Sequence, residues 1–261
     1  MNVVTKRLSQ VIYTVTALAG IKDEDIFLIS FPKSGNTWVK FILLNILIEA
    51  KELKAGASFK VLDETIPELS RDNLMRPWKY KILPRFIKSH IVYRKLFFRN
   101  NKALFIVRDP RDVMVSYFHY VNNNYGYNFQ GDFSAFIRHE KLGLEACLLH
   151  HVSWQNKAAV TIKYEDLKIN GTDVLYNALA KLGINVKHSL VSQAFENATF
   201  ENMQKLEQGP KKYTRTHKKE YNFMRKGTGN QWLDYFSGTD VDYYNALLKK
   251  HNARYINYYE S

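Results

Sequence analysis

The sequence has little cysteine and no long hydrophobic run. Its 261 residues include one cysteine, Cys147, which excludes an intrachain disulfide framework and a cysteine-rich metal site, so a cytoplasmic location is expected. No stretch approaches the roughly 18 apolar residues of a membrane-spanning helix, which predicts that the chain is not an integral membrane protein. Because no repeat, low-complexity tract or Pro/Gly/Ser linker divides the chain, we expect one domain over residues 23–261.

Acidic residues are too few to balance the basic ones. The chain has 38 Lys and Arg against 25 Asp and Glu, a net charge of +13. Residues 76–102 hold nine basic residues and no acidic one, and residues 211–226 hold seven against Glu220. The surplus indicates an anionic partner: a phosphorylated cofactor, a polyanionic sugar, an acidic membrane or nucleic acid. A basic surface without a dedicated ligand is the alternative interpretation.

Residues 1–22 have an amphipathic pattern. Lys6 and Arg7 precede apolar residues that recur at helical spacing up to Ala19, with Ser9 and Thr14 among the polar residues that interrupt them. This predicts an amphipathic helix rather than a cleaved secretory signal. The helix either packs on the domain or makes peripheral contact with a membrane surface.

Short apolar runs alternate with helical patterns along the rest of the chain. The pattern predicts strands at residues 25–31, 86–91, 103–108 and 159–164. It predicts helices at residues 37–53, from 110 onward, near 173–182 and at 240–255. Asp109 and Pro110 suit the start of the second helix as cap and first residue. This order predicts an α/β fold, a single domain with a central parallel sheet flanked by helices. Ligands of such sheets bind at the carboxyl ends of the strands.

The sharpest motif is FPKSGNTW at residues 31–38, between a predicted strand and a predicted helix. Backbone N–H groups and the helix dipole meet at such a loop and form an anion site, which Gly35 leaves open. The candidate residues are Pro32, Lys33, Ser34, Gly35, Asn36, Thr37 and Trp38. The loop is P-loop-like but lacks G-x-x-x-x-G-K-[ST], which disfavours a P-loop kinase or ATPase. A plain strand-to-helix turn is the alternative.

Two further segments carry cations suited to phosphate. Arg108 ends a predicted strand in VRDPRDVMVSYFHY, and Ser116 follows on the next helix, so both can bind one phosphate group. The alternative for Arg108 is an ion pair with Asp112. The segment FMRKG adds Arg225, Lys226 and Gly227.

Together with KYEDL at residues 163–167, these motifs resemble the cytosolic-type sulfotransferases, which use 3′-phosphoadenosine-5′-phosphosulfate (PAPS). The resemblance spans about residues 26–236. It implies that FPKSGNTW binds the 5′-phosphosulfate, and that Arg108, Ser116, Arg225, Lys226 and Gly227 bind the 3′-phosphate. Trp38, Tyr164 and Phe200 would surround the adenine, and adenosine 3′,5′-bisphosphate (PAP) would be the product. The family pattern Gly-Asp-Trp after the last motif is replaced here by residues 228–232, TGNQW, which predicts a different local loop.

The resemblance also implies catalytic roles. In the segment IKSH, His90 would deprotonate the acceptor hydroxyl, and Lys88 would hold a sulfonyl oxygen. Lys33 can stabilise the departing phosphate, so no metal is expected. The acceptor is expected to be a glycan, glycolipid or small alcohol or phenol, with no nucleic acid partner. Two other functions stay open, a nucleotide kinase that uses Mg²⁺ and a non-enzymatic polyanion-binding protein.

Overall fold

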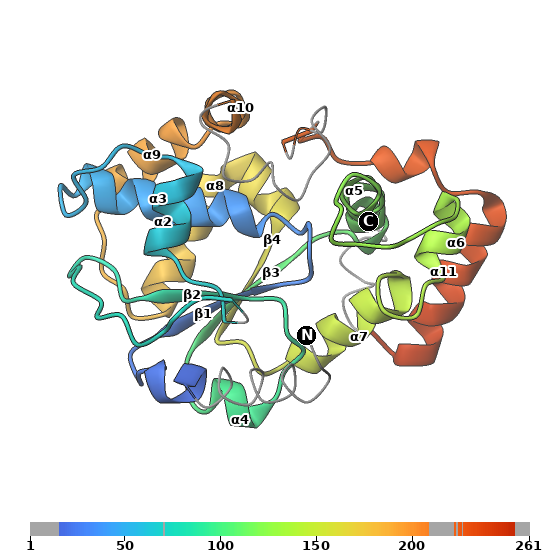
Figure 1. Ribbon diagram of the computed structural model, residues 1–261, viewed down its shortest axis with the longest axis horizontal. Helices are drawn as coiled ribbons and strands as arrows, with labels where there is room; N and C mark the ends of the chain where they lie inside the picture. Colours follow the sequence, from blue (N-terminus) through green and yellow to red (C-terminus); the bar gives the residue numbers. More distant parts are fainter. Residues whose placement is uncertain (1–15, 70, 209–221, 223, 226, 254–261) are drawn as a thin grey trace.

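A parallel sheet lies at the centre of the molecule (Figure 1). The computed structural model describes residues 16–69, 71–208, 222, 224, 225 and 227–253. The strands are β1 (Ile26–Ser30), β2 (Phe86–Ser89), β3 (Ala103–Val107) and β4 (Val160–Lys163). They lie in the order β2-β1-β3-β4, all parallel. In this register Phe27 lies opposite Ile87 of β2 and Ala103 of β3. The predicted α/β fold with a central parallel sheet is confirmed.

Helices cover both faces of the sheet, which explains why its two central strands, β1 and β3, are buried at every position. The helices are α2 (Asn36–Glu49), α3 (Phe59–Thr65), α4 (Lys95–Phe98), α5 (Pro110–Asn122), α6 (Phe133–Ile137), α7 (Leu144–Trp154), α8 (Tyr164–Lys181), α9 (His188–Asn197), α10 (Phe200–Glu207), the 3₁₀ turn η2 (Gln231–Asp234) and α11 (Gly238–His251). Leu28 and its neighbours pack with α2, α8 and α9 on one face. Phe27 and Phe105 pack with Phe98 and Trp154 on the other.

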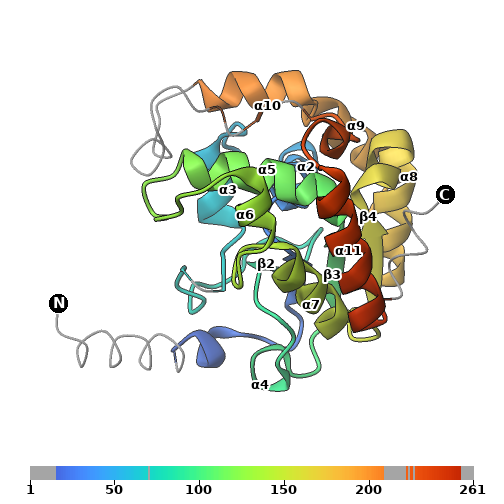
Figure 2. The same cartoon turned by 90° about the vertical axis from the view of Figure 1, so that its right-hand side faces the viewer.

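A second core lies to one side of the sheet, where α5, α6, α7 and α11 pack around Phe136 and Leu247. Figure 2 shows α7 and α11 side by side. Asp109 accepts a hydrogen bond from the backbone N–H of Arg111 and Pro110 is the first residue of α5, as predicted from the sequence. This cap fixes where the helix begins directly after β3.

The observed elements differ from the predicted ones mainly at their ends. β2 stops at Ser89, whose hydroxyl accepts a hydrogen bond from the backbone N–H of Ile91. The helix expected near residues 173–182 begins at Tyr164 and runs past a non-helical residue, Asn170. Helices α3, α4, α6, α7, α9 and α10 were not predicted. Three of them, α3, α4 and α6, span only seven, four and five residues, too few to show a helical period.

The predicted N-terminal helix lies mostly outside the described residues, since the description starts at residue 16. Residues 16–20 are helical, and Ala17 and Ile21 are buried in the core under the sheet. None of the helices in the described ranges has the length and apolarity that crossing a bilayer requires.

Candidate active site

A cavity of about 500 Å³ lies at the carboxyl ends of the strands. The predicted site residues that line it are Pro32, Lys33, Gly35, Asn36, Thr37, Trp38, Lys88, His90, Arg108, Ser116, Tyr164, Phe200, Arg225 and Gly227. They converge because the segment after each parallel strand emerges at the same edge of the sheet. Ser34 belongs to the same loop, but it is fully buried and does not line the cavity. Lys226 lies outside the described residues.

The loop between β1 and α2 has a left-handed backbone at two residues. Gly35 has φ 100° and begins α2 without a capping side chain, while Lys33 has φ 68°. A Cβ on Gly35 would lie 2.5 Å from Cδ2 of Tyr164, so only glycine fits here. The first N–H groups of a helix have no partner within it. The N–H of Trp38 donates to the carbonyl of Gly35 at 3.0 Å. Without a capping side chain, the N–H groups of the two residues before it stay available to an anion.

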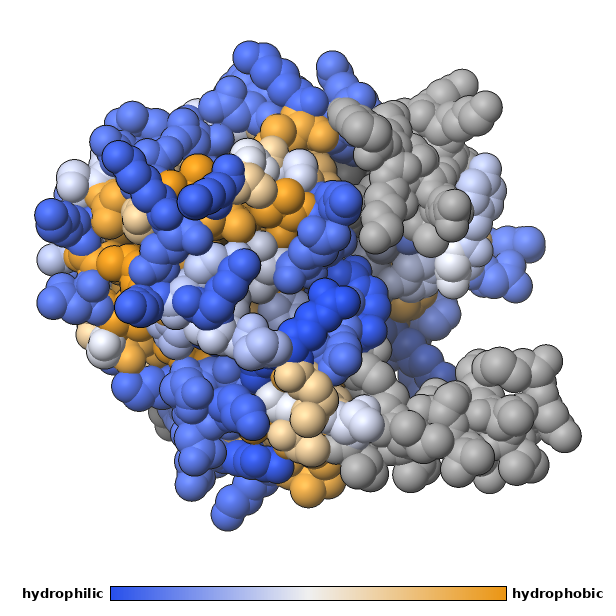
Figure 3. All heavy atoms as spheres, turned by 60° about the vertical axis from the view of Figure 1, so that its left-hand side comes forward, coloured by the Kyte–Doolittle hydropathy of each residue, from blue (hydrophilic) through white to orange (hydrophobic). Residues whose placement is uncertain are grey.

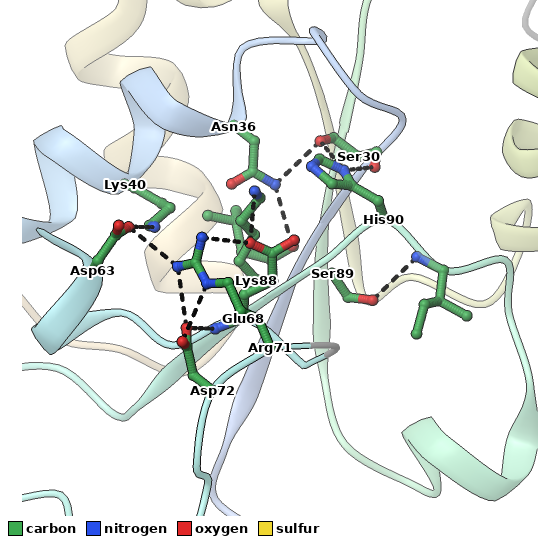
Figure 4. A network of polar contacts seen from close by, with 12 residues as sticks. Ser30, Asn36, Lys40, Asp63, Glu68, Arg71, Asp72, Lys88, Ser89 and His90 are labelled. Carbon is green, nitrogen blue, oxygen red and sulfur yellow. Dashed lines mark hydrogen bonds and ion pairs between the residues drawn. The ribbon is translucent and has the colours of Figure 1, made fainter. Parts of the chain in front are cut away.

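His90 is held by β1. Its Nδ1 lies 2.6 Å from the carbonyl oxygen of Ser30. Because a carbonyl can only accept, Nδ1 carries the hydrogen and donates it, which leaves Nε2 as the nitrogen able to take a proton. Asn36 fixes the same strand end, since its Nδ2 donates to the Ser30 hydroxyl at 3.1 Å (Figure 4). Burial, followed by the charge of Lys88, lowers the pKa of His90 to about 3.

Cations dominate the cavity wall. Lys33, Arg71, Lys88, Arg108, Lys168 and Arg225 line it, against one carboxylate among the described lining residues, Glu68. Burial, and then the charge of Arg108, lowers the pKa of Lys33 to about 7. Lys33 Nζ also lies 4.9 Å from the ring centre of Tyr120. A cavity of this charge favours a multiply charged anion.

Lys88 forms part of a charged network in Figure 4. Its Nζ donates to Glu68 at 3.1 Å, and Arg71 approaches Glu68 at 3.5 Å. Arg71 also pairs with Asp63 and with Asp72. The backbones of the two segments are also hydrogen-bonded. The N–H of Lys88 donates to the carbonyl of Pro67, and the N–H of Leu69 donates to the carbonyl of Lys88. The segment around Glu68 therefore extends the edge of the sheet beside β2.

Arg108 connects the loop between β1 and α2 to the segment around Thr228. Its guanidinium donates to the carbonyl of Lys33 at 3.3 Å and to that of Thr228 at 3.4 Å. It lies 3.6 Å from Asp112, so the ion pair considered from the sequence is present but long. Its Nε is buried without a partner in the described structure. Asp112 instead accepts from the backbone N–H groups of Asn230 and Trp232, which holds the TGNQW segment.

Aromatic side chains form another wall. Trp38 and Tyr164 meet edge to face with ring centres 5.7 Å apart, and Trp38 Nε1 donates to the carbonyl of Ala198 at 2.9 Å. Phe200 packs so closely on Gly227, where φ is 65°, that a Cβ there would lie 2.9 Å from its ring. These rings are positioned to hold a flat heterocycle next to the cations.

Several lining residues were absent from the predicted set. They are Glu68, Arg71, Lys168, Met203, Met224 and Gln231. Lys168 stands one helical turn after Tyr164 and donates to the carbonyl of Gly227 at 2.7 Å, so the helical spacing could have identified it. Glu68 and Arg71 lie in a segment without periodic pattern, and no sequence signal marks them.

Comparison with known proteins supports one family. The family model described as "Sulfotransferase domain" matches residues 23–255. The chain belongs to the sulfotransferase family. It is 26% identical to sulfotransferase 1B1 of the dog (Canis lupus familiaris) over 88% of this chain and 83% of that one. It is 24% identical to sulfotransferase 2A1 of the rat (Rattus norvegicus) over 89% of this chain and 86% of the relative.

Solved structures show the same fold. Mouse sulfotransferase SULT7A1, complexed with PAP, matches with a TM-score of 0.67 at 20% identity. The match covers 94% of this chain and 91% of the mouse chain. Retinol dehydratase, solved with androsterone and PAP, has a TM-score of 0.69 at 18% identity over 92% of this chain and 84% of its own. The resemblance stated from the motifs is thus confirmed at the level of family and fold.

Proposed function

We propose that this sulfotransferase transfers a sulfuryl group from PAPS to a hydroxyl group of its acceptor. Membership of the family supports sulfuryl transfer, and the PAP complex of the mouse neighbour supports the identity of the donor. The donor supplies the sulfuryl group and leaves as PAP. One observation carries the assignment: the unprotonated Nε2 of His90 and the cationic loop around Lys33 belong to one cavity.

The residues of the cavity fit such a donor. The buried Nε of Arg108 has no partner among the described atoms, and a phosphate oxygen would satisfy it. A Cβ on Gly35 would collide with Tyr164, so the glycine lets this ring pack directly against the loop. We assign the α2 N-terminus to the 5′-phosphosulfate. Arg108, Ser116, Arg225, Lys226 and Gly227 are assigned to the 3′-phosphate, and Trp38, Tyr164 and Phe200 to the adenine.

Three side chains do the chemistry in this proposal. His90 Nε2 accepts the proton of the acceptor hydroxyl, and Ser30 holds the imidazolium by accepting from Nδ1. Lys33 offsets the negative charge that develops on the phosphate oxygen, and Lys88 holds a sulfonyl oxygen. We propose that no metal takes part.

The test combines binding and turnover. PAP at concentrations well above its dissociation constant should raise the unfolding temperature, since a ligand that binds only the folded state stabilises it. His90→Ala should retain PAP binding and lose roughly 10²- to 10⁴-fold in sulfuryl transfer from labelled PAPS. A polyanion-binding protein would bind PAP weakly and transfer nothing. A nucleotide kinase would transfer phosphate from ATP and need Mg²⁺. Either result would contradict the proposal.

A further inference from the structure

A second cavity, of about 750 Å³, adjoins the first. It lies among the segments that follow α2 and precede β2, and Arg71 lines both cavities. Through Arg71 it meets the wall of the first cavity that carries Lys88 and His90, so a long acceptor has room to extend into it. An acceptor that reaches from one cavity to the other passes Arg71.

Aromatic rings line this second cavity. Phe59, Trp78 and Tyr80 all belong to its wall. The rings of Trp78 and Tyr80 meet edge to face with centres 4.8 Å apart, and Trp78 Nε1 donates to the carbonyl of Leu83 at 2.7 Å. The carboxylate of Glu52 accepts from the backbone N–H of Lys81 at 2.8 Å, which fixes the same loop. The rings are therefore held in place before any ligand arrives.

The cations that line the second cavity differ in whether an acidic side chain pairs with them. Arg71 is already engaged by Asp63, Glu68 and Asp72. Lys60, Arg76 and Lys79 also line the cavity and are exposed. In the described part of the chain, no carboxylate lies within ion-pair distance of these three side chains, while one exposed carboxylate, Glu64, stands beside them. Figure 3 shows hydrophilic side chains surrounding hydrophobic patches on this side of the molecule.

Fixed rings beside unpaired cations are the features that bind anionic sugars: the rings contact the apolar faces of the sugar and the cations bind its carboxylates. We propose that the acceptor is an acidic oligosaccharide whose reacting hydroxyl lies at His90 and whose distal uronate-bearing residues occupy the second cavity. This inference rests on the proposed function and names its acceptor class.

The test compares two tetrasaccharides of equal length as acceptors with labelled PAPS at 0.15 M salt. One alternates glucuronate and N-acetylhexosamine, and the other is neutral, made of N-acetylglucosamine. The wild-type enzyme should show a KM about 10-fold lower for the acidic one, as expected for two or three weak charge contacts acting together. The double variant Arg76→Glu/Lys79→Glu should raise the acidic KM by at least that factor and leave the neutral KM and kcat unchanged.

A matched control separates local contacts from net charge. Lys141→Glu/Lys249→Glu changes the total charge equally at exposed positions that line neither cavity, and it should behave like the wild type. Equal KM values for the two sugars, or an acidic KM that the first double variant leaves unchanged, would overturn the inference. So would turnover of a small phenol with no transfer to either sugar. If PAP also fails to bind by calorimetry, the donor assignment fails, and the acceptor inference fails with it.

Discussion

Proton uptake on donor binding gives the most direct test of the electrostatics at Lys33. The pKa of this side chain is about 7, mainly because of burial and the charge of Arg108. At pH 7 about half of the molecules therefore carry a neutral amine. A bound anion favours the charged form and raises that pKa. PAP binding should then draw a proton onto Lys33 in the molecules where it is neutral.

The expected stoichiometry changes sign with pH. At pH 8 Lys33 is about nine-tenths neutral, so binding should take up about 0.9 proton. At pH 6 it is already about nine-tenths charged, and the two phosphates of PAP, each with a second pKa near 6, together release about one proton on meeting the cations. Net uptake at pH 8 should thus become net release of about 0.9 proton at pH 6.

Calorimetry in buffers of different ionisation enthalpy measures this exchange. Lys33→Arg and Lys33→Met cannot change protonation there, so both should lose the uptake at pH 8 and keep the release at pH 6. His90→Asn should keep both, because the pKa of His90 is about 3 and the ring stays neutral at both pH values even if bound PAP raises that pKa by about two units. Indistinguishable uptake at pH 8 by the wild type and Lys33→Met would refute the assignment of the shifted pKa to Lys33.

Three further changes test other parts of the structure. Gly35→Ala places a Cβ 2.5 Å from Tyr164 at a positive φ, so it should cost about 1–3 kcal/mol of stability and weaken PAP binding, as urea unfolding and titration will show. Glu68→Gln removes the single described carboxylate of the cavity wall and should tighten PAP binding on the order of threefold, whereas weaker binding would show that Glu68 is needed to position Lys88. Burial lowers the pKa of His151 to about 4. The unfolded state therefore binds the extra proton below about pH 6.5, and stability should fall by about 2 kcal/mol between pH 6.5 and pH 5. His151→Leu should remove that part of the pH dependence of urea unfolding.

The sequence predicted those parts of the site that depend on local geometry. Parallel strands deliver their following residues to one edge, so His90, Arg108 and Tyr164 could be grouped once the strands were recognised. Lys33 and Gly35 carried their own signal, because a glycine-containing loop between a strand and a helix is a known anion site.

Long-range contacts account for what the sequence missed. Glu68 reaches the cavity because its backbone pairs with that of Lys88, twenty residues further along the chain. Asp112 was considered as an ion-pair partner of Arg108, yet it also holds residues 230 and 232 across more than a hundred positions. The second cavity is built from α3 and from the loops between α2 and β2. The seven residues of α3 are too few to show a helical period, and the loops have no period at all.

The pKa values of Lys33 and His90 bring donor binding and activation together. Without an anion in the cavity, Lys33 is only half charged at neutral pH and His90 is too weak a base to take a proton from a hydroxyl. An anion raises both pKa values at once, because both charged forms are cationic. In the proposed reaction the donor therefore charges the lysine that stabilises its leaving oxygen. It also strengthens the base that activates the acceptor, so deprotonation of the acceptor depends on the donor being in place.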